Sequence, residues 1–326
     1  MRADKNWNRR LFLQTAATAM AIPVFAPFSG LAKTFSTQNN SLNNNNQNEM
    51  NTENKIPFIT LNNGKVIPQL GFGTWTLTEK PEQYVREAIE VGFRLIDTAQ
   101  GYQNEAGVGK GIKDSDIDRK DIFLTTKIGP DVMRNRTVKQ SIDTSMEKLQ
   151  TDYLDLMLIH WPVKEHIQET WGIMEDYANK GLIKSIGLSN FNPHHIDDLL
   201  KYAKIKPVIN QIEIHPSFSN MENAGRTLYR EIPVQCWSPL GAGKDLDNPV
   251  LIELAKKYNK CVAQIILRWN IQRGLLTVTR STNVKHMKED FNIFDFELSA
   301  VDMSIINGIN RNERTYEKND PDSFPW

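Results

Sequence analysis

The chain has 326 residues, and its 39 basic side chains balance its 39 acidic ones to give a formal net charge of zero. This balance provides neither a basic field for nucleic acid nor an acidic tail, so we expect no nucleic-acid partner. Two cysteines, Cys236 and Cys261, are too few for a disulfide framework. We expect both to pack in the interior, although the sequence leaves a disulfide between them open.

Residues 1–55 differ in composition from the rest of the chain. The pair Arg9 and Arg10, followed by an apolar, alanine-rich stretch up to Ala32, resembles a twin-arginine export signal. An amphipathic or uncleaved membrane anchor is the alternative. Thr, Pro and Gly interrupt the stretch, however, and it is shorter than the about 20 strongly apolar residues of a stable span. We therefore predict a signal peptide over residues 1–32, read by the twin-arginine export machinery.

Residues 33–55 are rich in asparagine and contain too few apolar residues to form a core, which predicts a disordered linker. The folded domain is then expected over residues 56–326. The export signal predicts a periplasmic protein, and without a working signal the protein would be cytoplasmic.

From residue 56 onward, apolar runs alternate with helical patterns. A hairpin with an Asn-Gly turn is predicted over residues 58–67, and a final helix over 298–309 precedes a covering loop at 316–326. Eight strand–helix alternations over roughly 275 residues favour a parallel (β/α)8 TIM barrel over a doubly wound sheet. The eight strands are expected near residues 69–73, 93–97, 122–127, 154–160, 183–188, 208–213, 234–238 and 276–280, and helical patterns lie at 81–91, 138–149, 168–179 and 249–258.

Polar side chains stand at or after the ends of three successive predicted strands. Asp97 ends one strand, and Tyr102 follows five residues later in a glycine-containing loop. Lys127 ends the next strand, and His160 ends the third. Because strand C-termini converge on one face of a parallel barrel, we expect these four side chains to meet there.

These four residue types suit protonation of an oxygen atom. A tyrosine with an ordinary pKa of about 10 is a poor acid near neutrality, but a neighbouring lysine is expected to lower that pKa. Asp97 would keep Lys127 charged, and His160 would hold a carbonyl oxygen near Tyr102. Taken singly, each residue also fits a helix cap, a solvated lysine, a rim histidine or a packing aromatic. No activated nucleophile is present, so the electron pair is expected from a reduced nicotinamide.

Several segments from roughly residue 56 to the C-terminus match one family in order and spacing. They are Gln69–Trp75, Asp97–Glu105, Thr126–Lys127, His160–Pro162, Gly181–Phe191, Pro207–Glu213 and Trp237–Leu240. On these segments the chain is similar to the aldo-keto reductases, close to bacterial enzymes that act on 2,5-diketo-gluconate and small aldehydes. The resemblance implies that the hairpin plugs the base of the barrel and that Asp97, Tyr102, Lys127 and His160 have the roles above.

The resemblance also implies a nicotinamide site at other strand ends. Asparagine and glutamine side chains offer the donors and acceptors that the primary amide of a nicotinamide needs, and a flat aromatic side chain can stack on its flat ring. The dinucleotide fingerprint of doubly wound folds is absent, since Gly71 and Gly73 lack the third glycine and the helix start. Ser189, Asn190 and Gln211 match positions that hold the carboxamide, Trp237 matches the stacking aromatic, Ser238 and Leu240 follow it in the cofactor site, and Trp75, His160 and Trp161 match the substrate pocket.

The segment expected to bind the cofactor's phosphate end departs from the family pattern. Arg280 and Ser281 can still bind a 2′-phosphate. Glu289 keeps the family residue, but His286 stands where relatives have Arg, and Asp290 where they have Asn. We therefore predict NADPH as cofactor and keep NADH, or use of both, as the alternative.

The predicted function is reduction of aldehyde or ketone groups by a monomeric enzyme. One alternative is a non-catalytic nicotinamide-binding sensor on the same barrel. Another is a metal-dependent barrel hydrolase, which the sequence disfavours because only His160 among six histidines ends a strand. His194 and His195 are adjacent at a helix start, and we expect that they cannot face one ion together. We predict no metal site.

Overall fold

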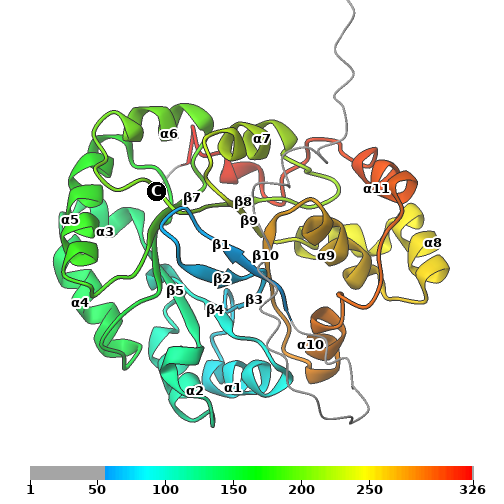
Figure 1. Ribbon diagram of the computed structural model, residues 1–326, viewed down its shortest axis with the longest axis horizontal. Helices are drawn as coiled ribbons and strands as arrows, with labels where there is room; N and C mark the ends of the chain where they lie inside the picture. The colour runs from blue at the N-terminus through cyan, green and yellow to red at the C-terminus, as the bar shows by residue number, and fades with distance from the viewer. Residues whose placement is uncertain (1–55, 325–326) are drawn as a thin grey trace, which may run out of the picture. The chain divides into compact units, whose positions relative to one another are not determined.

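The computed structural model describes residues 56–324, and eight strands within it are parallel neighbours in one closed barrel. The helices form a ring around these strands (Figure 1), which confirms the predicted parallel (β/α)8 barrel. Each predicted strand overlaps an observed one, with ends that differ by a few residues. The barrel strands are β3 (Leu70–Gly73), β4 (Leu95–Asp97), β5 (Phe123–Ile128), β6 (Leu156–Ile159), β7 (Ile186–Ser189), β8 (Asn210–Glu213), β9 (Val234–Trp237) and β10 (Leu276–Thr279), and their order around the barrel is β10-β3-β4-β5-β6-β7-β8-β9.

The helices begin where the sequence provides a stop or a cap. Proline occupies the first position of α1 and α8, where its missing N–H needs no partner. The final helix starts later than predicted, because the Ser299 side chain accepts the Asp302 N–H and caps it. The α-helices are α1 (Pro81–Val91), α2 (Glu105–Lys113), α3 (Pro130–Arg134), α4 (Val138–Lys148), α5 (Ile167–Asn179), α6 (Pro193–Leu200), α7 (Met221–Tyr229), α8 (Pro249–Tyr258), α9 (Val262–Gln272), α10 (Val284–Phe291) and α11 (Ala300–Asn307).

The predicted hairpin closes the amino-terminal end of the barrel. Its strands β1 (Phe58–Thr60) and β2 (Val66–Pro68) pair antiparallel, and Gly64 adopts φ 79° in the turn, a conformation that favours glycine. Asn62 donates to the carbonyl of Pro207, just before β8, and Asn63 donates to Ser185 Oγ, just before β7. The hairpin therefore sits against the start of the barrel strands and leaves their carboxyl ends open.

Aliphatic side chains fill the barrel interior next to the hairpin. Ile67 of the hairpin packs in one buried cluster with Leu95, Leu156 and Leu276 from three barrel strands. Gly71 makes room for this packing, since a Cβ there would lie 2.6 Å from the Leu95 side chain. Burial of this aliphatic layer stabilises the barrel and places the polar residues of the same strands nearer the open end.

Both cysteines are free thiols. Cys236 is buried in β9, and burial raises its pKa to about 12, so it stays protonated and unreactive. Cys261 lies at the cap of α9 and is half-buried. The structure thus agrees with packing roles and shows no bond between them.

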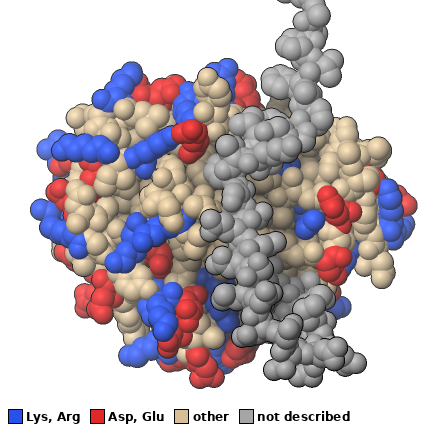
Figure 2. Space-filling view, in the orientation of Figure 1, with Lys and Arg blue, Asp and Glu red and all other residues tan. Residues whose placement is uncertain are grey.

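On the one face that Figure 2 shows, basic and acidic side chains are interspersed.

The signal peptide predicted over residues 1–32 and the linker predicted over 33–55 lie outside the described residues, so both stay predictions. Within residues 56–324, no helix has the length and apolar character needed to span a bilayer.

Candidate active site

The four residues predicted for catalysis meet at the carboxyl end of the barrel. The Lys127 ammonium lies 2.5 Å from Asp97 Oδ1 and 3.3 Å from the Tyr102 hydroxyl oxygen, and it also donates to the Thr98 carbonyl oxygen at 2.9 Å. Lys127 and Asp97 are both buried. A buried lysine with a carboxylate, a carbonyl and a phenol around it has all its ammonium hydrogens directed at acceptors.

Strand pairing brings Asp97 and Lys127 together. Asp97 of β4 pairs with Thr125 of β5, and Lys127 lies two residues further on, so it projects from the same face of that strand. Tyr102 ends the short 3-10 helix η3 (Gln100–Tyr102) rather than lying in an irregular loop. The Gln100 side chain holds this turn by accepting from the backbone N–H of Gly129.

His160 follows the last residue of β6, and its ring meets the Tyr102 ring edge-on, with 5.7 Å between centroids and 76° between planes. Burial, assisted by the charge of Lys127, holds the pKa of His160 well below its ordinary value. The imidazole is therefore neutral at physiological pH. A neutral imidazole keeps one N–H donor for a substrate oxygen.

Several opposing effects set the pKa of Tyr102. Burial raises it, the charge and hydrogen bond of Lys127 lower it, and Asp97 raises it, so that the pKa lies above the ordinary value. Lys127 thus lowers the pKa of Tyr102 as predicted, but desolvation of the phenolate, which the sequence did not reveal, outweighs the ammonium. For Lys127 itself, burial lowers the pKa, but Asp97 and Tyr102 raise it overall. Tyr102 thus holds its proton beside a charged lysine.

A buried chain of amides supports Asp97 from within the barrel. The Gln211 side-chain nitrogen donates to Asp97 Oδ2 at 2.7 Å and to Gln235 Oε1 at 2.7 Å. Gln211 was predicted to hold a carboxamide, and the structure places its amide against Asp97 as well. Gln235 was missed, although its inward position two residues before Trp237 follows from strand alternation.

Three residues predicted for the nicotinamide lie beside His160. Asn190, with φ 61°, donates from its side chain to the His160 carbonyl oxygen at 3.0 Å and to Ser189 Oγ at 3.2 Å. The Trp237 indole N–H donates to Asn190 Oδ1 at 2.8 Å. Next along the chain, Ser238 accepts the Ala242 N–H, and half-buried Leu240 packs at the edge of a core cluster.

The residues predicted to bind the phosphate end of the cofactor fall into an exposed group and a buried one. Arg280 and His286 are exposed and Ser281 is half-buried beyond the end of β10. Asp290 instead turns inward, where its carboxylate accepts the Thr279 hydroxyl at 2.7 Å. Burial raises the pKa of Asp290 to about 7.

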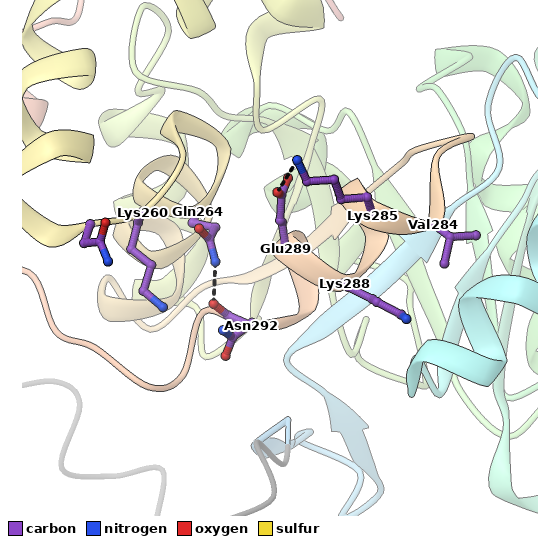
Figure 3. Close-up of a pocket in the computed structure, with 8 residues that line it drawn as sticks. Lys260, Gln264, Val284, Lys285, Lys288, Glu289 and Asn292 are labelled. Atoms are coloured by element: carbon purple, nitrogen blue, oxygen red, sulfur yellow. Dashed lines mark hydrogen bonds and ion pairs between the residues drawn. The ribbon is translucent and has the colours of Figure 1, made fainter.

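An open cavity of about 580 Å³ lies between α10 and the start of α9 (Figure 3). Lys260, Lys285 and Lys288 line it, together with Glu289 from the predicted cofactor set. Glu289 faces Lys285 at 3.8 Å. The cavity is lined by side chains of α10, and none of the four residues predicted for catalysis lines it.

The two tryptophans predicted for the substrate pocket contact the C-terminal segment. Tyr316 meets Trp75 edge-on at 6.1 Å between centroids. Phe324 stacks on Trp161 with 3.6 Å between centroids and 4° between planes. The predicted covering loop is thus present over its described part, up to residue 324. The roles of Tyr316 and Phe324 were missed, and their aromatic character in an otherwise polar tail was the available signal.

A buried polar cluster fastens the start of this tail. The Thr315 N–H donates to Glu213 Oε1 at 2.5 Å, and His215 Nδ1 lies 2.8 Å from Asp245 Oδ2. Burial lowers the pKa of His215, but the hydrogen bonds and charges of Asp245 and Glu213 raise it overall. The tail is therefore joined to the barrel immediately before the aromatic contacts.

The expectation that His194 and His195 cannot face one point is wrong. Their rings lie 4.0 Å apart, and the Nε2 atoms are 3.0 and 3.3 Å from the same Asp322 oxygen, Oδ1. The reason is local. His195 turns back to accept the Asn192 N–H at 3.1 Å, which directs its ring alongside that of its neighbour.

Comparison with known proteins agrees with this geometry. A sequence model of the aldo/keto reductase family matches residues 69–311. Glyoxal reductase of Bacillus subtilis (strain 168) is 43% identical over 258 residues, which are 78% of this chain and 94% of that protein. Methylglyoxal reductase DkgA of Escherichia coli (strain K12) is 38% identical over 271 residues, which are 82% of this chain and 97% of that protein.

Solved structures show the same likeness. An aldo/keto reductase from Brucella melitensis superposes with a TM-score of 0.75 at 43% identity, covering 78% of this chain and 100% of that one. The Bombyx mori aldo-keto reductase in complex with NADP gives 0.77 at 36% identity, covering 83% and 98%. Because the family model covers most of the chain and these relatives are matched over nearly their whole length, the chain belongs to the aldo/keto reductase family and is an oxidoreductase.

Proposed function

We propose that the protein reduces small aldehydes of the glyoxal and methylglyoxal class to alcohols with NADPH, and that Tyr102 is the general acid. The carrying observation is the buried contact of Lys127 Nζ with Asp97 Oδ1 and the Tyr102 hydroxyl, beside a neutral His160. The names of the two reductases above support the substrate class.

The side chains present suit a nicotinamide cofactor. Both amide hydrogens of Gln211 are already donated, so its Oε1 would accept from the carboxamide NH2. Ser189 and Asn190 would hold the same group, and Trp237 would lie against the ring. When bound, the reduced nicotinamide supplies the hydride.

At the other end of the cofactor, exposed Arg280 and neighbouring Ser281 would bind the 2′-phosphate. Binding of a guanidinium to a phosphate is strengthened by paired hydrogen bonds, which NADH cannot form at this point. This difference supports NADPH over NADH.

The residues around Tyr102 explain how a proton would reach the substrate. The Tyr102 hydroxyl gives its proton to the carbonyl oxygen as negative charge develops there, and the Lys127 ammonium stabilises the phenolate left behind. Before the transfer, Asp97 balances the lysine charge, so the buried pair carries no unpaired charge. The neutral His160 ring donates its N–H to the same oxygen and orients it.

The mouth of the site supports small substrates. Tyr316 of the tail contacts Trp75, and Phe324 stacks on Trp161. These two aromatic pairs would line the entrance with rigid apolar surface, which favours compact carbonyl compounds over bulky ones.

The test is Tyr102→Phe, assayed by NADPH consumption with methylglyoxal. Loss of a general acid should lower kcat by about 10²–10⁴-fold, while quenching of tryptophan fluorescence by NADPH stays as in the parent. Tyr229→Phe, at a tyrosine 85% exposed to solvent, is the control. Activity of the Tyr102 variant within a few-fold of the parent would show that another group is the acid. A parent that binds NADPH and reduces no aldehyde would favour the sensor.

We further propose, from Arg9 and Arg10 and the apolar stretch behind them, that the chain is exported through the twin-arginine route. This proposal is independent of the chemistry above.

A further inference from the structure

A cluster of metal-binding side chains lies outside the catalytic centre. His194 and His195 of α6 and Asp322 of the C-terminal segment each offer one ligand atom, and these atoms all lie within 4.8 Å of one another. The proposed reductase chemistry uses none of the three. We propose that they form a site for a divalent transition metal of the Zn²⁺ type, which joins the C-terminal segment to α6.

The spacing suits a tetrahedral ion. Zn–N and Zn–O bonds of about 2.0–2.1 Å in tetrahedral geometry separate neighbouring ligand atoms by about 3.3 Å. Asp322 Oδ1 already lies 3.0 Å from His194 Nε2 and 3.3 Å from His195 Nε2. The two imidazole nitrogens must close to a similar distance. His194 can supply that movement because its side chain is 60% exposed, whereas that of His195 is 12% exposed and fixed.

The ligand types select the class of ion. Two imidazoles and one carboxylate match the donor sets of zinc sites that keep one position for water. Calcium and magnesium prefer oxygen ligands throughout. Asp322 has a half-exposed side chain, so an ion can enter from solvent.

The hydrogen bonding of His195 limits the expected affinity. In the structure, His195 Nδ1 accepts the Asn192 N–H, so its proton is on Nε2. Metal binding at Nε2 moves that proton to Nδ1 and gives up this capping bond. We therefore expect a moderate affinity rather than that of a buried structural zinc site.

An ion here would act on the substrate pocket through the tail. Asp322 lies two residues before Phe324, and Phe324 stacks on Trp161. Fixing Asp322 on α6 holds the tail near that stacked position. The site is thus placed to tighten one wall of the substrate entrance.

The experiment is a titration of tag-free, chelator-treated protein with Zn²⁺ by calorimetry, with Co²⁺ absorption reporting tetrahedral coordination. We expect one ion per chain in the parent. Loss of any one of the three ligands should weaken binding by more than about tenfold, because even the loss of a group that only supports a metal ligand has an effect of that size. The variants are Asp322→Asn, His194→Ala and His195→Gln. Glutamine at position 195 keeps an acceptor for the Asn192 N–H, so the start of α6 stays capped.

The matched control is Asp320→Asn. Asp320 lies on the same segment, and the change removes the same charge while keeping an oxygen for the Asp322 N–H. Its affinity should equal that of the parent. A parent that binds no ion, or any one of the three ligand variants binding like the parent, would overturn the three-ligand site. Because the titration needs no reductase activity, its failure is distinct from failure of the proposed function.

Discussion

Asp290, one of the residues predicted to bind the cofactor, should also make the stability of the folded protein depend on pH. The residue is 4% exposed, its carboxylate accepts the Thr279 hydroxyl, and its pKa is raised by burial to about 7. An acid whose pKa is higher in the folded than in the unfolded state makes folding less favourable once it ionises. This penalty is absent below the unfolded pKa of 3.8 and fully developed above the folded pKa.

The size of the penalty follows from the two pKa values. One pKa unit corresponds to about 1.4 kcal/mol, so a rise from 3.8 to about 7 corresponds to about 4 kcal/mol at pH 8. At pH 5 the carboxyl group is mostly ionised in the unfolded chain but still protonated in the folded one, and the difference of about 1.2 pH units from the unfolded pKa gives about 2 kcal/mol. Asp290→Asn has no ionisable group, and its amide oxygen can still accept the Thr279 hydrogen.

The assay is urea denaturation of the parent and of Asp290→Asn at pH 5 and pH 8. The variant should be the more stable protein, and its advantage should grow by about 2–3 kcal/mol between the two pH values. Glu289→Gln, on the neighbouring and less buried residue, removes a carboxylate of the same charge and is the control. An advantage that does not change with pH would show that the folded protein does not hold Asp290 protonated, and the reasoning would fail.

Three further predictions concern the cofactor, the tail and the N-terminus. Arg280→Ala should weaken NADPH binding by about 1.5–3 kcal/mol and leave NADH unaffected, as measured by tryptophan fluorescence. Equal losses would make Arg280 structural, and equal parent affinities would refute the NADPH preference. Phe324→Ala should raise KM for methylglyoxal about 2- to 13-fold, from the 0.5–1.5 kcal/mol of an aromatic pair; an unchanged KM would show that its stack on Trp161 does not shape the pocket. Replacing Arg9 and Arg10 by Lys should retain the protein in the cytoplasm on fractionation, whereas unchanged export would indicate another route.

Local sequence patterns were enough to predict the barrel and the acid centre. Asp97 and Lys127 each close an apolar run, and parallel pairing of neighbouring strands makes their meeting a consequence of topology. The helix bounds could be predicted nearly as well, because Pro81 and Pro249 mark the starts of two helices in the sequence itself. These features depend on short-range chemistry and on one repeated architecture.

Contacts between distant segments were not predictable in the same way. The pairing of Phe324 with Trp161 and of Asp322 with α6 depends on the path of a tail that has no repeating pattern. The raised pKa of Tyr102 was missed for a related reason. Sequence shows which charges are neighbours, but the desolvation that outweighs Lys127 follows only from the packed structure.

Two hydrogen bonds connect the acid centre with the predicted nicotinamide site. Gln211 donates to Asp97, and Asn190 donates to the carbonyl oxygen of His160, so a residue of β8 and the residue after β7 contact two of the four residues proposed for catalysis. A change in either amide therefore acts on the acid as well as on the cofactor. Loss of activity in a Gln211 variant would not by itself assign Gln211 to the carboxamide, because Asp97 loses a donor at the same time. A shift in the pH profile would report the effect on Asp97 and Lys127, and a changed cofactor affinity would report the other role.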